Sequence, residues 1–180
     1  MSYSVSVVAV DLALVRGVIA QSTHPVRAKV HADVGTSEGR ALGALLGGPT
    51  LPPVSASELG YALQDLCGRL GRGVGANGLS GIRSEFLSNA ETTVDAIYVH
   101  STGFSLRRLV EGGPPVQLPP IDDFPAIGFV EADVVARAHA WTVANEPSHP
   151  DPDLDQVLVD VAGWLAEAAP RGWGLVAFYA

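Results

Sequence analysis

Residues Tyr3 to Val10 read Tyr-Ser-Val-Ser-Val-Val-Ala-Val, and residues Trp173 to Ala180 read Trp-Gly-Leu-Val-Ala-Phe-Tyr-Ala. Both stretches are rich in β-branched, aromatic and other apolar residues, which predicts two strands, the first of them buried on both faces toward its end. An isolated strand leaves its backbone amides unpaired, so each strand needs a neighbour. We therefore expect the two ends of the chain to pair at the centre of a small sheet.

Between these strands the sequence predicts mainly helices. The clearest begins at Ser55, where Ser55-Ala-Ser-Glu58 fits a capping box and apolar residues at helical spacing follow as far as Leu70. A second strong helix is expected from Leu154 to Ala169, and Asp11 is expected to cap a short helix after the first strand. Weaker patterns predict helices at residues 25–33, 38–46, 82–93, 105–110 and 129–144.

Glycine and proline mark the connections. Gly71 to Gly81 holds five glycines and is expected to be loop, and Pro114 to Pro125 holds five prolines and is expected to be extended. Asp95 to His100 fits either a short strand or the end of the preceding helix. The predicted fold is α+β, a helix-rich single domain over residues 1–180, with one layer of helices on a small sheet that pairs the N- and C-terminal strands.

Composition excludes several classes of protein. The chain has 180 residues, 47% hydrophobic and 17% charged, with a net charge of −8, as expected for a soluble globular protein. The single cysteine, Cys67, excludes an intramolecular disulfide and a zinc site of two or more cysteines. The acidic balance and the single lysine argue against nucleic acid and anionic membranes as partners. Without a membrane span or a basic leader, a cytoplasmic location is the default expectation.

The charge is unevenly distributed along the chain. Residues 1–90 carry seven basic and six acidic groups, whereas residues 91–180 carry four basic and thirteen acidic groups. Such a run of acids is typical of a solvated surface that keeps a protein soluble. It also fits an acidic surface that meets a basic partner.

A possible acid–base site centres on Asp122 and Asp123. Adjacent acids on an extended segment point to opposite sides, so they are not a facing catalytic pair. One of them either caps a turn before Phe124-Pro125 or lines an apolar pocket as a general base. His139, near Trp141, and Tyr98 with His100 would complete such a site if the fold brings them together.

Other motifs predict no cofactor and no metal site. The glycines from Gly71 to Gly78 follow a helix, whereas a phosphate-binding loop follows a strand and opens a helix, so a linker is favoured. No two histidines have the spacing that places metal ligands on one helix face, and no Gly-x-Ser-x-Gly motif occurs. Cys67 lies on the apolar stripe of its helix, which favours a buried, inert thiol. The three tryptophans are most simply core residues.

Several stretches together resemble an actinobacterial domain-of-unknown-function family of small, stand-alone cytoplasmic proteins. The resemblance spans nearly the whole chain, is weakest from Gly71 to Gly103, and is most specific at Asp-Asp-Phe-Pro-x-Ile-Gly, which begins at Asp122. It implies one domain without a signal peptide and supplies no activity, so no catalytic role is carried over. The stretches are Ser4 to Leu12, Tyr61 to Cys67, Gln117 to Gly128 and Gly174 to Tyr179.

The leading hypothesis is a soluble binding or protein-interaction module, similar in character to an immunity or regulatory protein, with an unknown protein or small molecule as its partner. The acidic second half and the segment from Val116 to Pro125 would form its contact surface, and a homodimer stays open. The alternative is a small-molecule enzyme that uses Asp/His acid–base chemistry in a Trp/Tyr-lined pocket, and a third reading is a protein with a Trp-lined ligand pocket. The residues assigned are Asp122, Asp123, His139 and Tyr98 for catalysis and Phe124, Trp141 and His100 for binding.

Overall fold

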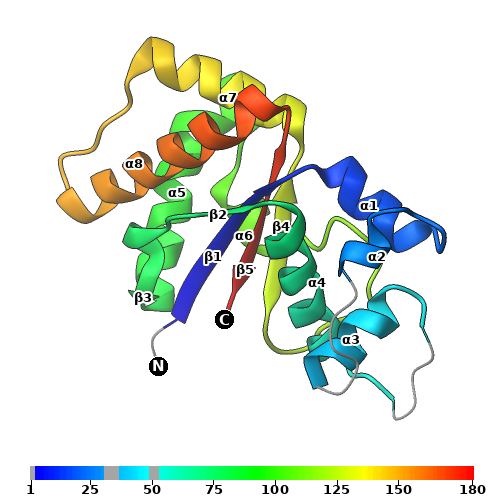
Figure 1. The fold of residues 1–180 in the computed structure, drawn as a ribbon. Helices are drawn as coiled ribbons and strands as arrows, with labels where there is room; N and C mark the ends of the chain where they lie inside the picture. The colour runs from blue at the N-terminus through cyan, green and yellow to red at the C-terminus, as the bar shows by residue number, and fades with distance from the viewer. Residues whose placement is uncertain (1–2, 31–36, 49–52) are drawn as a thin grey trace.

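The structure is a computed structural model that describes residues 3–30, 37–48 and 53–180 (Figure 1). Its centre is the antiparallel pair of β1 (Tyr3–Val10) and β5 (Gly174–Tyr179), with Val8 opposite Val176. The pairing continues beyond β5, because the Ser4 amide donates to the Ala180 carbonyl at 2.9 Å. The predicted pairing of the two ends of the chain at the centre of the sheet is confirmed, and so is the α+β class.

Three shorter strands complete the sheet. β2 (Arg72–Val74) pairs with β1 on its other side, β4 (Ala126–Val130) pairs with β5, and the order is β2-β1-β5-β4. β3 (Ser80–Ile82) pairs with the first residues of β1. β2 and β4 are therefore the outer strands beside the central pair.

Helices cover both faces of the sheet, so the expected single layer of helices is wrong. Alternate residues of β1 enter opposite cores, Val7 in one and Val8 in the other. The reason is the unbroken apolar run at the end of β1 and along β5, which presents apolar side chains on both faces and is stable only when both are covered. One layer comprises α5 (Ser84–Thr102), α6 (Leu106–Glu111), α7 (Ala132–Asn145) and α8 (Pro152–Ala168), and the other comprises α1 (Leu12–Ala20), α2 (Arg27–Val30), α3 (Ser37–Leu45) and α4 (Ala56–Leu70).

The strongest sequence signals for helix starts are confirmed. The Asp11 carboxylate accepts the Leu14 amide at 3.0 Å, and Ser55 and Glu58 form the reciprocal capping box that the sequence predicted. Ser105 caps α6 by accepting the Arg108 amide. Each cap satisfies a backbone donor that has no partner inside its helix.

The expectation that residues 71–81 are loop is wrong. β2 and β3 lie at either end of this stretch, with a short 3-10 helix, η1 (Asn77–Leu79), between them. Glycine weakens a strand locally, but both of these strands are short and pair with the long strand β1. The backbone pairing with β1 therefore overrides the local preference for a turn.

Three helix boundaries also differ from expectation. Residues 126–130 form the strand β4, so the helix expected from Phe129 begins only at Ala132. α5 extends through Asp95 to His100, which are helix rather than strand. The helix expected at residues 25–33 is the single turn of α2, and residues 31–33 lie outside the described residues.

Gly128 allows α6 to pack directly on β4. A Cβ atom at Gly128 would lie 2.3 Å from the Leu109 carbonyl oxygen and 2.4 Å from that of Arg108. These are backbone atoms at the C-terminal half of α6, so they cannot turn away as a side chain can. The Gly113 amide, just after α6, also donates to the Ile127 carbonyl at 2.8 Å. This contact holds α6 against the strand at the β4 side of the sheet.

We predict that Gly128→Ala lowers the free energy of unfolding by about 2–3 kcal/mol, because the added methyl group forces α6 away from β4. Urea denaturation followed by circular dichroism measures the change. The control is Gly68→Ala in α4, where a Cβ atom meets nothing within 4 Å, so a gain of about 0.5–1 kcal/mol in helix propensity is expected. Equal effects of the two substitutions would contradict this description of the α6–β4 contact.

Candidate functional site

The candidate site is an open groove between β2 and α8, which we call the β2–α8 groove. One wall consists of β2 and the following Gly75, and the groove has a volume of about 290 Å³. In Figure 1, β2 and α8 lie next to each other at the side of the sheet away from β4. The other wall is formed by Val159, Asp160, Gly163, Trp164 and Glu167 of α8.

Buried polar contacts tie the two walls together. Asp160 is only 7% exposed, and its carboxylate accepts the Gly78 amide at 2.7 Å and the Gln156 side-chain amide at 3.1 Å. The Trp164 indole N–H donates to the Gly75 carbonyl. Since buried donors and acceptors are costly to leave unpaired, these bonds fix the segment after β2 against α8. The groove is therefore a preformed feature of the fold.

At one end of the groove, the Glu167 carboxylate pairs with two arginines, of which Arg72 lines the groove and Arg171 follows α8 in sequence. The Glu167 Oε1 atom lies 3.0 Å from Nη1 of Arg72 and 3.0 Å from Nη1 of Arg171. Arg171 also donates to the Glu167 carbonyl at 2.6 Å and stacks over the Trp173 ring. Glu167 is mostly covered, whereas the Arg72 side chain is 64% exposed. The guanidinium of Arg72 is therefore a charge that a ligand in the groove would meet.

Two glycines keep the groove open. A Cβ atom at Gly73 or Gly163 would meet nothing within 4 Å. Packing of the protein itself therefore does not require glycine at either position, and a side chain there would project into free space. Both positions can be filled by substitution without an internal clash.

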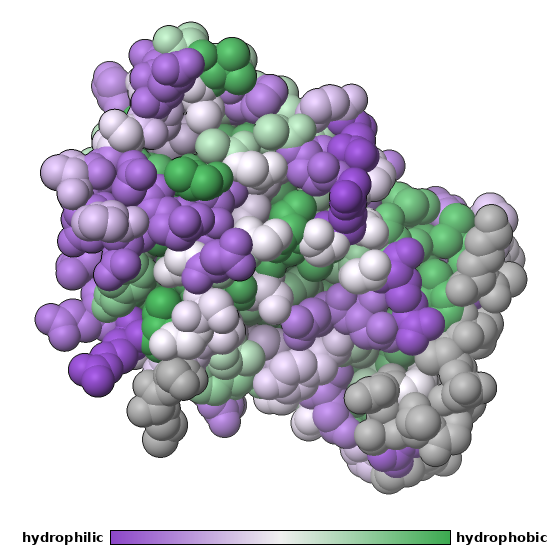
Figure 2. All heavy atoms as spheres, turned by 60° about the vertical axis from the view of Figure 1, so that its left-hand side comes forward, coloured by the Kyte–Doolittle hydropathy of each residue, from purple (hydrophilic) through white to green (hydrophobic). Residues whose placement is uncertain are grey.

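Exposed apolar side chains are few and separate. Figure 2 shows single hydrophobic residues within a largely hydrophilic surface on the side of the molecule that carries α8. Of the large exposed apolar residues, Val159 lines the groove and is 58% exposed. The others in the described part of the chain lie on other helices: Tyr61 on α4, Val99 on α5 and Val143 on α7.

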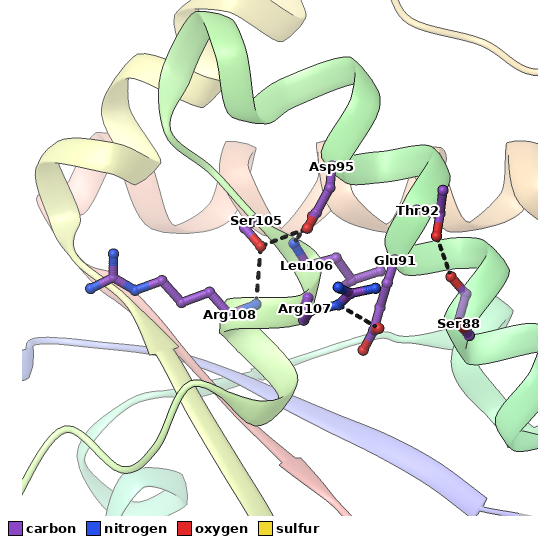
Figure 3. Close-up of polar contacts among 8 residues, drawn as sticks. All are labelled: Ser88, Glu91, Thr92, Asp95, Ser105, Leu106, Arg107 and Arg108. Atoms are coloured by element: carbon purple, nitrogen blue, oxygen red, sulfur yellow. Dashed lines mark hydrogen bonds and ion pairs between the residues drawn. The ribbon is translucent and has the colours of Figure 1, made fainter.

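A second polar cluster lies between α5 and α6 (Figure 3). The Asp95 carboxylate accepts the Ser105 hydroxyl at 2.8 Å and the Leu106 amide at 2.7 Å, so it binds the start of α6. One turn earlier on α5, Glu91 points toward Arg107 of α6, and its Oε2 accepts the Arg107 Nε–H at 3.2 Å. This cluster fixes α6 on α5.

Glu91 is the unusual member of this cluster. It is 5% exposed, and its Oε1 atom is buried without a hydrogen-bond partner. Burial raises the pKa of Glu91, and the nearby carboxylates of Glu111 and Asp95 raise it further, while the Arg107 hydrogen bond and charge lower it. The fold therefore holds the pKa of this carboxyl group above its ordinary value.

The residues assigned from sequence fall into two groups. The Tyr98 ring packs on Phe104 and on Trp141, with its centroid 5.1 Å from that of Trp141. Its hydroxyl forms a 3.0 Å hydrogen bond with Thr142, and burial raises its pKa. The structure thus brings together two of the proposed residues, Tyr98 and Trp141, in a buried contact between α5 and α7. His100 is exposed on α5, and His139 is half-buried on α7.

The other group lies just before β4. Asp122 and Asp123 are both exposed, and Phe124 packs its ring against Tyr3 and Tyr179, whose centroids lie 5.4 and 5.6 Å away. Phe124 therefore anchors this segment to the ends of the central strands. The catalytic and binding roles assigned to these residues stay predictions.

The structure also bears on the thiol, the metal site and the membrane span considered from the sequence. Cys67 is fully buried in α4, as expected, and burial raises the pKa of its thiol to about 12, which disfavours the reactive thiolate. Within residues 3–30, 37–48 and 53–180, no three His, Cys, Asp or Glu side chains gather closely enough to hold a metal ion. In the same part of the chain, every helix is too short or too polar to cross a bilayer.

Sequence reasoning missed the β2–α8 groove. The linker expected from Gly71 to Gly78 and the loop expected from Gly71 to Gly81 leave no place for the wall formed by Arg72, Gly73 and Val74. One signal was available on the other wall, because Glu167 and Arg171 have the four-residue spacing of a helical ion pair. The participation of Arg72 depends on the sheet register and has no local signal.

The fold defines a class of small α+β proteins in which an antiparallel sheet is covered by helices on both faces. Within that class, the chain belongs to the family described as Domain of unknown function (DUF7691), which matches residues 1–180. No curated protein matches the chain. No solved structure matches it.

We predict that Glu91→Gln stabilises the protein increasingly as the pH rises. Because the pKa of Glu91 is raised in the folded state, the wild type loses stability as the pH rises from the ordinary glutamate value of 4.5 through the raised value. The glutamine side chain is neutral throughout, so the gap in the free energy of unfolding should be absent in acid and should widen as the pH rises toward neutral. Thermal unfolding of both proteins across this pH range measures it.

The matched control is Asp133→Asn on α7. The Arg137 hydrogen bond lowers the pKa of Asp133, so removal of this carboxylate should give no stability gain as the pH rises. A stability gap for Glu91→Gln that is constant with pH would show that Glu91 has the same charge state in the folded and unfolded chain.

Proposed function

We propose that the protein is a protein-binding module that holds an extended segment of a partner protein in the β2–α8 groove. The observation that carries the proposal is the position of an outer strand, β2, beside an open groove whose other wall is a helix. Backbone hydrogen bonds from β2 would hold the partner segment, and α8 would contact its side chains.

The outer side of β2 supplies the backbone part of this interaction. β2 pairs with β1 on one side, and within residues 3–30, 37–48 and 53–180 no further strand follows it in the strand order on that side of the sheet. A strand at the end of a sheet presents unpaired N–H and C=O groups to any extended chain that lies alongside it. The three residues of β2 span about 10 Å, enough for a short strand of a partner.

The α8 wall supplies the side-chain part. Val159 is exposed and apolar, and Gly163 leaves free space. Trp164 joins the two walls through the hydrogen bond from its indole N–H to the Gly75 carbonyl. The groove volume of about 290 Å³ is just below that of pockets that enclose small molecules, which are roughly 300–1,000 Å³. An open groove of this size favours a chain segment that continues beyond both of its ends.

The proposal modifies the contact surface expected from the sequence. α8 belongs to the acidic second half of the chain, which was expected to meet the partner. The segment from Val116 to Pro125 instead packs partly inward, because Ile121 and Pro125 lie against Gly60 of α4. The enzyme alternative keeps Asp122, Asp123, His139 and Tyr98 as its residues.

The experiment selects ligands on the folded chain from a displayed library of random linear peptides. A synthetic copy of a selected peptide is then titrated into the isotope-labelled protein. Chemical-shift changes of backbone amides are expected at residues 72–75 and 159–167. Changes confined to any other surface, or failure to select a binding peptide, would overturn the proposal.

We predict that Gly163→Leu reduces the affinity of the selected peptide at least tenfold, because the leucine side chain fills the groove. A Cβ atom meets no neighbour at Gly163, so the variant should fold with a stability equal to or above that of the wild type. Isothermal titration calorimetry measures the affinity. Gly68→Leu is the matched control, since Gly68 also lies in a helix with open space around it but on α4, and it should bind as the wild type does.

A further inference from the structure

We infer that the β2–α8 groove selects partner segments that carry an acidic side chain beside Arg72. This inference rests on the proposed function and adds the chemical class of the ligand. It runs against the net charge of −8, which alone would favour a basic partner. The charged side chains around the groove, and not the net charge of the chain, determine which partner segment it prefers.

At the Glu167 end of the groove, cations outnumber anions. Glu167 neutralises one of its two arginine neighbours, Arg72 and Arg171, so one positive charge is left over. The Nη1 atom of Arg72 contacts Glu167, and a guanidinium carries five N–H donors in a fork that matches a carboxylate. Because Arg72 belongs to β2 itself, a segment lying alongside β2 would pass within reach of these donors.

The second acid that lines the groove, besides Glu167, is not available to a ligand. Asp160 is buried, and its two carboxylate oxygens are occupied by the Gly78 amide and the Gln156 side chain. A basic side chain of the partner would have to displace these bonds, which also hold η1 on α8. The accessible charge of the groove is therefore that of Arg72.

The other acids of α8 lie too far away to reverse this preference. Asp151, Asp153 and Asp155 are at the N-terminal end of the helix, about 20 Å along its axis from Glu167. Salt screens exposed charges beyond roughly 8 Å at physiological ionic strength. The acidic end of α8 thus contributes to net charge and solubility, and the arginine pair determines what binds at the Glu167 end of the groove.

The test compares charge variants of a selected peptide. The selected sequences should be enriched in Asp or Glu, and replacement of that acid by Gln should weaken binding about two- to fivefold, the range of an exposed ion pair. Replacement of the same acid by Lys should weaken binding more than replacement by Gln does. The affinities are measured by fluorescence anisotropy at low and high salt, and the difference between the acidic and neutral peptides should shrink as salt is added.

Substitution of Arg72 supplies the second half of the test. Arg72→Glu should reverse the order of the peptides, so that the Lys version binds most tightly, and Arg72→Gln should abolish the preference without reversing it. Arg108→Glu is the control, since Arg108 is an exposed arginine of α6 that points away from its neighbours in Figure 3, and the preference should persist.

The two failures are distinguishable. If Gly163→Leu blocks binding but Arg72→Glu leaves the order of the peptides unchanged, the groove is the binding site and the charge preference is wrong. If Gly163→Leu leaves binding intact, the groove is not the binding site, and both the proposed function and the preference for an acidic segment are wrong. Selected peptides that lack acids or are enriched in Lys and Arg would also overturn the inference.

Discussion

The structure depends on the antiparallel pairing of β1 with β5, which joins the first and last described strands of the chain. Both strands carry apolar side chains on two faces, so successive residue pairs alternate between two cores: Val7 and Ala177 lie in one, Val8 and Val176 in the other. Burial of one valine side chain is worth about 1.5–3 kcal/mol, and these strands bury such side chains almost without interruption. Every other element either extends the β1–β5 pair sideways or covers one of its faces. The groove exists because β2 extends the sheet beside β1.

The sequence predicted the elements whose signals are local. Asp11, Ser55 and Ser105 identify helix starts because capping joins atoms only three residues apart. β2, β3 and β4 escaped prediction because they are short and are stabilised by pairing with distant strands rather than by their own residues. The second layer of helices follows from the two apolar faces of the central strands, a feature that the sequence contains and that the single-layer expectation overlooked.

The candidate site was harder to predict for the same reason. Arg72 and Glu167 are ninety-five positions apart in the printed sequence, and only the register of β2 on β1 brings them together. The sequence pattern instead singles out residues with distinctive chemistry. Of these, Tyr98 and Trp141 contact each other, and this buried contact stabilises the α5–α7 packing. Glu91 could not be predicted either, because nothing in its sequence context distinguishes a buried glutamate from an exposed one on the same helix.

The place of β5 at the very end of the described chain bears on how the protein is made. β1 leaves the ribosome first, yet its main partner is synthesised about 170 residues later, as the register of Val8 on Val176 requires. Until then, among the described strands, β1 has the three-residue strand β2 beside Val7 and Val8 and the three-residue strand β3 beside its first two residues. Such long-range pairing is slow and leaves apolar strands open to wrong partners. The helices can form during translation, but the β1–β5 pair closes only after β5 has been synthesised, so products truncated before β5 are candidates for aggregation and for capture by chaperones.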